Sequence, residues 1–252
     1  TLMRSSAASD VYKRQVEELE KKVTPKTKAI LIGYPNNPTG TIMDRESLEK
    51  VAAFAKAHDL IVIADEIYCD LTYEGQHTCF ASLPDMQERT IVMNGFSKSY
   101  AMTGLRIGYI CAPREALEEI YKVHQYEILC ASTTSQYGAI EALRNCDDDV
   151  KAMFEEYAAR CEMIYQGLVD IGLTVFKPKG AFYIFPDISC TGMDDEEFCD
   201  RLLSEEKVGV VPGTCFGPQG KNHIRISYAA SRENIAEALK RIARFVKKYK
   251  KA

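Results

Sequence analysis

Short continuous runs of apolar residues recur through the first half of the chain. They occupy residues 29–32, 60–64, 90–93 and 107–112. Runs of this length, bounded by turn-forming residues, are typical of strands buried on both faces of a sheet. Between the first two runs, apolar residues from Leu48 to Ala55 follow the spacing of one helix face, and Asp44 precedes them as a helix cap. Strands that alternate with helices predict an α/β domain with a largely parallel sheet.

A different pattern begins near residue 147. Apolar residues from Val150 to Leu168 form a stripe on one long helix. Short strands are expected at residues 173–176, 181–185, 208–211 and 224–227, and helices at 194–206 and 231–249. We therefore expect a larger domain over residues 16–146 and a smaller α+β domain over residues 147–252. Residues 1–15 are rich in serine and alanine and lack periodicity, so we expect them to be disordered or foreign to the native sequence.

Composition narrows the classes of function. The 252 residues are 46% hydrophobic and 27% charged, which is ordinary for a globular protein with ample core. The formal net charge of −4 gives no electrostatic basis for binding nucleic acid. No apolar run reaches membrane-spanning length and no signal peptide is visible, so we expect a cytoplasmic protein.

Cysteine and histidine are not spaced as metal ligands or disulfide partners. The nine cysteines are Cys69, Cys79, Cys111, Cys130, Cys146, Cys161, Cys190, Cys199 and Cys215. None forms a CxxC pair, and several, such as Cys111, lie inside apolar runs, so we expect reduced, buried thiols. The four histidines are isolated from one another in sequence, and we expect no metal site.

Polar side chains follow the ends of the predicted strands. Asn37 follows the first strand, Asp65 and Tyr68 follow the second, and Lys98 follows the third. In open α/β sheets, ligands bind in the crevice at the carboxyl ends of the strands. We therefore expect these four side chains to converge on one crevice.

Lys98 is the candidate nucleophile. A lysine among small and hydroxyl residues suits Schiff-base chemistry on a phosphorylated cofactor, because the amine must reach a carbonyl while its neighbours bind the phosphate. Ser97 and Ser99 flank it, and Arg106 follows eight residues later. Ser97 and Arg106 are the candidate phosphate ligands, the arginine through charge-assisted bidentate hydrogen bonds. The alternative for an isolated Ser-Lys pair is an exposed loop lysine.

Four further residues have both a functional and a structural interpretation. A pyridine ring is the best electron sink when its nitrogen stays protonated, which a neighbouring carboxylate favours. Asp65 either pairs with such a cation or accepts hydrogen bonds from amides of a turn. Tyr68 and Asn37 could reach the ring oxygen of the same cofactor, or could serve packing and turn formation. Arg225 either faces solvent or clamps a substrate carboxylate.

Four motifs occur in order along the chain. They are Pro35-Asn36-Asn37-Pro38-Thr39-Gly40, Ala64-Asp65-Glu66-Ile67-Tyr68, Ser97-Lys98 with Gly104-Leu105-Arg106-Ile107-Gly108, and Arg225-Ile226-Ser227-Tyr228. Together they resemble the class I/II aminotransferases, which are fold-type I pyridoxal phosphate enzymes. The resemblance runs from about Val16 to the C-terminus. Because relatives have a long portion before the first strand, the chain resembles a C-terminal fragment.

The resemblance implies that pyridoxal 5'-phosphate is the cofactor and that Lys98 forms a Schiff base with it and later moves a proton. It also implies that Asp65 pairs with the ring nitrogen. The other implied roles belong to Asn37 and Tyr68 at the ring oxygen, Ser97 and Arg106 at the phosphate, and Asn37 and Arg225 at the substrate carboxylate. The implied reaction exchanges an amino group between an amino acid and a 2-oxo acid, and the implied full-length assembly is a homodimer.

Two other functions stay open, a pyridoxal phosphate-dependent C–S lyase and a non-catalytic effector-binding module or inactive fragment. Gly95 departs from the family pattern, in which many relatives have a phosphate-binding serine or threonine, so Ser97 is expected to take more of that task. Residues 124–134 contain no arginine that would pair with a distal acidic group. Aromatic, aliphatic and acylated diamino-acid substrates remain open, and acidic ones are weakly disfavoured.

Overall fold

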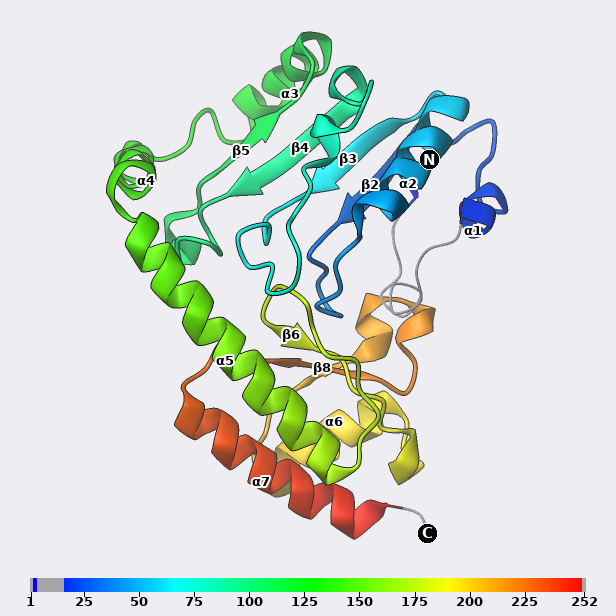
Figure 1. The fold of residues 1–252 in the computed structure, drawn as a ribbon, viewed down its shortest axis with the longest axis vertical. Coiled ribbons are helices and arrows are strands. Elements are labelled where there is room, and N and C mark those ends of the chain that lie inside the picture. Colours follow the sequence, from blue (N-terminus) through cyan, green and yellow to red (C-terminus); the bar gives the residue numbers. More distant parts are fainter. Residues whose placement is uncertain (1, 4–15, 251–252) are drawn as a thin grey trace. The chain divides into compact units, whose positions relative to one another are not determined.

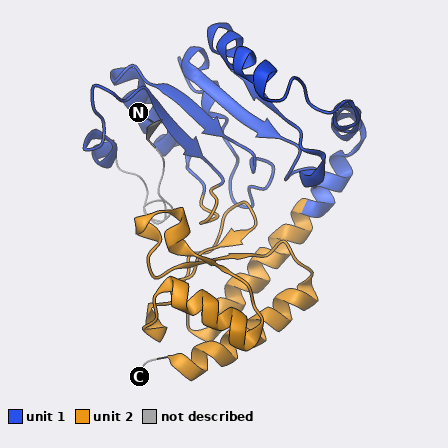
Figure 2. Ribbon diagram, turned by 180° about the vertical axis from the view of Figure 1, so that it is seen from behind, with its two compact units in different colours: residues 1–5, 13–35, 42–153 blue, residues 6–12, 36–41, 154–252 orange. Residues whose placement is uncertain are grey.

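The computed structural model describes residues 2–3 and 16–250 (Figure 1). Residues 1 and 4–15, most of the segment expected to be disordered or foreign, lie outside the described residues. The chain divides into two compact units (Figure 2). The described residues of the first unit are 2–3, 16–35 and 42–153, and those of the second are 36–41 and 154–250. The division falls inside a helix of 25 residues that begins at Asp147, so this one continuous helix contributes residues to both units.

The first unit contains a five-stranded mixed sheet. Its strands, in spatial order, are β1 (Leu2–Met3), β2 (Ala29–Gly33), β3 (Ile61–Asp65), β4 (Thr90–Gly95) and β5 (Gly108–Cys111). The first four run parallel and β5 is antiparallel to β4. The α/β fold with a largely parallel sheet is therefore confirmed.

Helix α2 (Arg45–Ala57) begins as its sequence predicts. The Asp44 side chain accepts a hydrogen bond from the Ser47 amide at 2.8 Å, which satisfies one of the unpaired donors of the first turn. The apolar face from Leu48 to Ala55 is buried together with alternate residues of β2 and β3, such as Ile30 and Val62. Only alternate strand residues are fully buried, so the expectation of strands buried on both faces is wrong for this unit.

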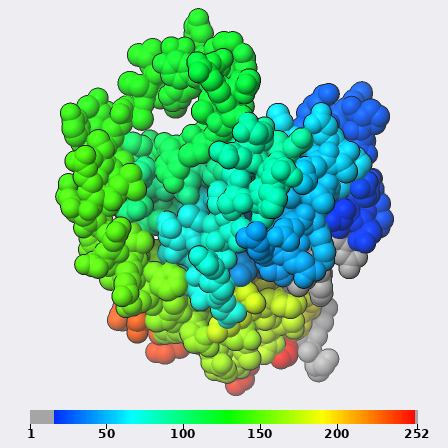
Figure 3. Space-filling model, turned by 45° about the horizontal axis from the view of Figure 1, so that its top comes forward, coloured from blue at the N-terminus to red at the C-terminus, as the bar shows by residue number. Residues whose placement is uncertain are grey.

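Helices α3 (Arg114–Glu127) and α4 (Thr133–Asn145) follow β5 and were not expected from the sequence. No residue of α3 is buried, and every residue of β5 is exposed. Cys111, expected to be buried, is therefore an exposed thiol, because β5 is the last strand of the sheet. In the space-filling view, this green part of the chain borders a hollow (Figure 3). A groove between β5 and α3 is lined by apolar side chains that include Tyr109, Leu117 and Tyr121.

The second unit combines a small sheet with three helices. Its strands β6 (Tyr183–Ile184), β8 (Ile224–Ser227) and β7 (Val211–Pro212) lie in that order and pair antiparallel. Its helices are α5 (Asp147–Ile171), which begins in the first unit, α6 (Asp195–Glu206) and α7 (Arg232–Tyr249). The strand expected at 173–176 is wrong: only Thr174 forms an isolated bridge, with Asp187.

Shorter elements complete the described chain. They are α1 (Val16–Glu20) and the 3-10 turns Phe80–Ser82, Gln87–Arg89, Thr103–Leu105, Ser189–Thr191, Gly213–Phe216 and Pro218–Gly220. Among the described residues, no helix is long and apolar enough to cross a membrane. The same residues contain no group of histidine, cysteine and acidic side chains that could hold a metal ion.

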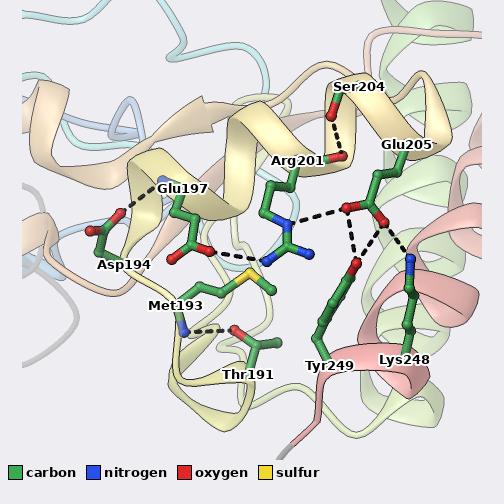
Figure 4. Close-up of polar contacts among 9 residues, drawn as sticks. All are labelled: Thr191, Met193, Asp194, Glu197, Arg201, Ser204, Glu205, Lys248 and Tyr249. Carbon is green, nitrogen blue, oxygen red and sulfur yellow. Dashed lines mark hydrogen bonds and ion pairs between the residues drawn. The ribbon is translucent and has the colours of Figure 1, made fainter.

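Helices α6 and α7 are joined by a polar cluster centred on Glu205 (Figure 4). Its carboxylate accepts hydrogen bonds from Lys248 Nζ at 2.8 Å, the Tyr249 hydroxyl at 2.8 Å and Arg201 Nε at 3.2 Å. The Arg201 guanidinium also lies 4.2 Å from the centre of the Tyr249 ring. These donors hold the pKa of Glu205 well below its ordinary value, at about 2.

Candidate active site

Strand register brings two candidate residues to one edge of the sheet in the first unit. Gly33 of β2 pairs with Asp65 of β3, and Asp65 pairs with Met93 of β4. The parallel strands therefore end level with one another, and Asp65 is the last residue of β3. Lys98 follows the end of β4 by three residues. Both side chains thus belong to the carboxyl edge, where α/β sheets bind their ligands.

Asp65 is a half-buried carboxylate next to a positive charge. Its Oδ1 accepts a hydrogen bond from the Ile67 amide at 3.2 Å. Burial raises the pKa of this carboxyl above its ordinary value, and the negative charge of Glu66 adds to the rise. The Ile67 amide and the Lys98 ammonium act in the opposite direction. The turn interpretation and the cation-pairing interpretation of Asp65 are therefore compatible, because one oxygen takes the amide while the group still responds to a cation.

Tyr68 brings its ring close to Lys98. The Lys98 ammonium lies 5.8 Å from the centre of the buried Tyr68 ring, within the range of a cation–π contact. Three of the sequence-predicted residues, Asp65, Tyr68 and Lys98, are thus neighbours in the first unit.

Thr103 connects the two candidate phosphate ligands. Its hydroxyl donates to the Ser97 carbonyl at 2.7 Å, and its own carbonyl accepts from Arg106 Nη1 at 3.0 Å. Arg106 is exposed and has a left-handed backbone with φ of 52°, as Ala101 has with φ of 53°. Such conformations in residues other than glycine cost free energy and cluster at functional sites. Sequence reasoning missed Thr103, since a hydroxyl six residues after Ser97 has no recognisable motif.

Glu66 is a second residue that sequence reasoning left without a role. It is 6% exposed, and its two oxygens accept from the Phe80 amide at 2.8 Å and contact His77 Nε2 at 2.9 Å. Its own amide donates to the Met93 carbonyl at 2.9 Å. Glu66 therefore fixes the segment from 77 to 80 and the end of β3, between which Tyr68 lies in sequence. A carboxylate directly after Asp65 in a buried strand end was the available signal.

The second unit contains the remaining two candidates. Asn37 Oδ1 accepts a hydrogen bond from Arg225 Nη1 at 2.9 Å, across a separation of 188 residues in sequence. Asn37 is exposed and Arg225 is half-buried on β8. The arginine thus has a specific partner rather than a purely solvent-facing side chain. Because the two units are separate bodies, the predicted convergence of Asn37 with Asp65, Tyr68 and Lys98 stays a prediction.

Comparison with known proteins identifies the family. A family model described as aminotransferase class I and II matches residues 4–242. The chain belongs to the class I and II aminotransferase family. The resemblance seen in the four motifs is therefore confirmed over nearly the whole chain.

Several relatives in this family have assigned names. The chain is 47% identical to the putative aminotransferase YugH of Bacillus subtilis, over 96% of this chain and 63% of the relative. It is 44% identical to aromatic-amino-acid aminotransferase 2 of Thermococcus litoralis, over 95% of this chain and 62% of the relative. It is 45% identical to an aspartate aminotransferase of Pyrococcus abyssi, over 95% and 62%. The chain thus spans less than two thirds of the length of these aminotransferases.

Solved structures agree in fold. A crystal structure of an aromatic aminotransferase from Pyrococcus horikoshii matches with a TM-score of 0.93 and 43% identity, over 96% of this chain and 66% of that one. An aspartate aminotransferase from Thermus thermophilus with maleate matches with a TM-score of 0.87 and 37% identity, over 95% and 62%. Names for both aromatic and aspartate enzymes occur at similar identity, so they do not choose between substrate classes.

The residues of the first unit fit the cofactor that this family uses, pyridoxal phosphate. Asp65 combines partial burial with a raised pKa, which is the setting in which a protonated ring nitrogen would stabilise the carboxylate. Lys98 supplies a primary amine next to the Tyr68 ring. Arg106 and Ser97 supply a guanidinium and a hydroxyl on one loop tied together by Thr103. This donor set matches an aldehyde, a pyridine nitrogen and a phosphate.

Proposed function

We propose that this protein is a pyridoxal phosphate-dependent aminotransferase that exchanges an amino group between an amino acid and a 2-oxo acid. The observation that carries the proposal is the grouping of Asp65, Tyr68 and Lys98 in one unit. The Lys98 ammonium lies 5.8 Å from the centre of the Tyr68 ring, and its charge acts to lower the pKa of the Asp65 carboxyl. Family membership supports it, because the named relatives are aminotransferases.

Each residue near the sheet edge has a task in this proposal. Asp65 would bind the ring nitrogen and hold its proton, Tyr68 would donate to the ring oxygen, and Ser97 and Arg106 would bind the phosphate. When bound, the cofactor supplies an electron sink for the negative charge that develops at the substrate α-carbon. Lys98 would hold the cofactor through its amine and then move the proton at that carbon.

In the second unit, Asn37 and Arg225 would bind the substrate α-carboxylate. A guanidinium and a carboxylate form two parallel hydrogen bonds, and an amide beside them adds a further donor. The 2.9 Å contact between Arg225 Nη1 and Asn37 Oδ1 orients the two side chains together. We extend the proposal to a cytoplasmic homodimer, as the family resemblance implies. Exposed apolar side chains from 105 to 143 support an interface there.

The test is reductive trapping of the cofactor. The protein is incubated with pyridoxal phosphate, reduced with sodium borohydride, digested and mapped by mass spectrometry. We expect the added mass on the peptide that contains Lys98 and its loss in Lys98→Ala. The matched control is Lys122→Ala, an exposed lysine that pairs with Glu119. Label on another lysine in the wild-type protein would contradict the assignment of Lys98.

A second assay separates the aminotransferase from a C–S lyase. The loaded protein is offered an amino acid together with a 2-oxo acid, and the new amino acid is measured by chromatography. Amino transfer supports the proposal. Release of pyruvate and ammonia from a cysteine conjugate, without transfer, would assign the lyase instead. Labelling at Lys98 with neither product would indicate the non-catalytic alternative.

A further inference from the structure

The Arg225 guanidinium in the second unit contacts two aromatic rings. Its central carbon is 4.6 Å from the centre of the Tyr183 ring and 4.8 Å from the centre of the Phe216 ring. Both distances are well inside the range at which a guanidinium stacks on or is attracted to an aromatic face. Contacts with two rings restrict the guanidinium more than contact with one ring would.

The N–H groups of the same guanidinium have few hydrogen-bond partners. Nη1 donates to Asn37 Oδ1 at 2.9 Å. Nε is buried and has no hydrogen-bond partner among the described residues. The side chain therefore keeps donor capacity beyond its bond to Asn37, while the rings of Tyr183 and Phe216 occupy space next to the guanidinium.

The two rings come from elements that are themselves fixed. Tyr183 is 8% exposed on β6, which pairs with β8 so that Tyr183 lies opposite Ser227, two residues from Arg225. Phe216 ends the turn Gly213–Phe216. This turn is held by the buried Asp195, whose Oδ2 accepts from the Thr214 amide at 2.9 Å and the Thr214 hydroxyl at 2.6 Å.

Ordinary core packing is the simpler explanation of the ring contacts. It does not account for a charged side chain that stays half-buried and retains a buried, unpartnered Nε–H, because such a donor costs free energy unless something offsets it. Leucine at positions 183 and 216 would pack as well, yet would offer no attraction to a cation.

We propose that Tyr183 and Phe216 are positioning residues that hold the Arg225 guanidinium so that a ligand reaches it in its plane. This rests on the proposed function, which takes Arg225 as the partner of the substrate carboxylate. The carboxylate site is then formed within the second unit alone, before any cofactor binds. In-plane access favours a planar carboxylate with two parallel hydrogen bonds over a tetrahedral phosphonate, whose third oxygen meets the rings.

The test follows the Arg225 Nε–Hε resonance by NMR in the full 252-residue chain, assigned by its loss in Arg225→Lys. Ring currents from two faces displace this resonance from that of free arginine. Phe216→Leu moves it back towards the free value and speeds its exchange with solvent, whereas Phe216→Tyr keeps the wild-type shift. Phe176→Leu, at an exposed phenylalanine of the same unit, is the control and leaves it unchanged.

Titration with propionate and ethylphosphonate completes the test. We expect propionate to shift the Arg225 resonance and to bind about three- to tenfold more weakly to Phe216→Leu than to the wild type. Phe216→Tyr should bind propionate with the wild-type affinity. Ethylphosphonate binds more weakly than propionate to the wild-type chain. Any one of three results overturns the inference. The wild-type Arg225 resonance could lie at the position of free arginine, Phe216→Leu could bind propionate as tightly as the wild type, or the wild type could bind the two anions equally. Reductive trapping at Lys98 tests the first unit, whereas these measurements test the second. A failure of the proposed function can therefore be told apart from a failure of this inference.

Discussion

Gly95 of β4 lies directly opposite Gly108 of β5, and neither position has room for a side chain. A Cβ on Gly95 would lie 2.8 Å from the Gly108 Cα and 3.0 Å from the Ile107 carbonyl oxygen. A Cβ on Gly108 would lie 2.8 Å from the Asn94 carbonyl oxygen. This close approach of two backbones leaves no room in this structure for the serine or threonine side chain that the family resemblance would place at position 95.

Gly95→Ser is therefore expected to destabilise the first unit rather than to improve phosphate binding. Backbone atoms cannot move aside as a flexible side chain does, so the free energy of unfolding should fall by about 1–3 kcal/mol. Urea denaturation measures this change. Gly104→Ala is the control, because a Cβ there meets nothing within 4 Å and should change stability little. Equal stability of Gly95→Ser and the wild type would show that β4 and β5 can separate.

Glu66→Gln should destabilise the chain although it preserves shape. Glu66 is an acceptor on both oxygens, towards the Phe80 amide and His77 Nε2. Glutamine has one acceptor and one donor, so its NH₂ would face either the Phe80 amide or the His77 ring. We expect a loss of about 1–3 kcal/mol in the free energy of unfolding, measured by urea denaturation. Glu88→Gln, at an exposed position, should have little effect.

Asp65 should make stability depend on pH in the opposite sense to a paired surface carboxylate. Its pKa in the folded chain is raised above the ordinary value of 3.8, so the folded state binds more protons than the unfolded state in the window just above that value. Stability then falls as pH rises through this window. Asp65→Asn removes the cost of the buried charge, so it should be more stable than the wild type at neutral pH and lose that advantage in acid.

Denaturant midpoints across pH measure this difference. The same variant should bind pyridoxal phosphate more weakly, because an amide cannot neutralise a pyridinium. A variant that is less stable than the wild type at neutral pH would show that the Ile67 hydrogen bond and Lys98 outweigh the burial of Asp65.

Glu205 should stabilise the fold at neutral pH and lose this effect in acid. Its pKa in the folded chain is about 2, below the ordinary value of 4.5, because Lys248, Tyr249 and Arg201 favour the charged form. Its stabilising effect is complete above the unfolded value and is lost as pH falls through the folded value. Glu205→Gln should therefore lower the thermal midpoint at neutral pH, with the difference from the wild type shrinking in strong acid. Added salt should reduce it too, since the cluster is exposed.

Glu196→Gln, an exposed glutamate on the same helix, is the comparison for that experiment. If both variants behave alike at every pH and salt concentration, the cluster of Glu205 contributes nothing to the contact between α6 and α7.

The exposed apolar residues between 105 and 143 should bind hydrophobic dyes. Twelve of the sixteen exposed large hydrophobic residues of the described chain lie between 105 and 143, among them Tyr126 and Leu129. Exposed apolar surface binds apolar ligands or partners. Leu129→Lys should reduce the fluorescence of bound ANS, whereas Leu203→Lys, at an isolated exposed leucine of the second unit, should leave it unchanged. Equal dye binding by both variants would place the apolar surface elsewhere.

Much of the fold was accessible from sequence because its signals are local. The run at 60–64 and the stripe behind Asp44 depend on residues within a few turns of one another, and β3 and α2 form where these patterns predict. Helices α3 and α4 were not expected, although α3 has a clear apolar stripe. The stripe is exposed on α3, so it does not report a buried core within the described residues.

The candidate site divides in the same way. Lys98, Asp65 and Tyr68 were found because each follows a predicted strand closely, and parallel strands end at one edge. Thr103 and Glu66 were missed because their roles depend on backbone atoms of a folded loop. The lack of space for a side chain at Gly95 depends on the position of β5, which the sequence around residue 95 does not indicate.

The sequence alone located β2, β3 and the helix that Asp44 caps, and it singled out Lys98 as the candidate amine, because these follow from residues adjacent along the chain. Only the tertiary structure decided which atoms meet across long separations. Arg225 contacts Asn37 over 188 positions and also contacts the rings of Tyr183 and Phe216, and such contacts depend on strand pairing and turn geometry rather than on local periodicity.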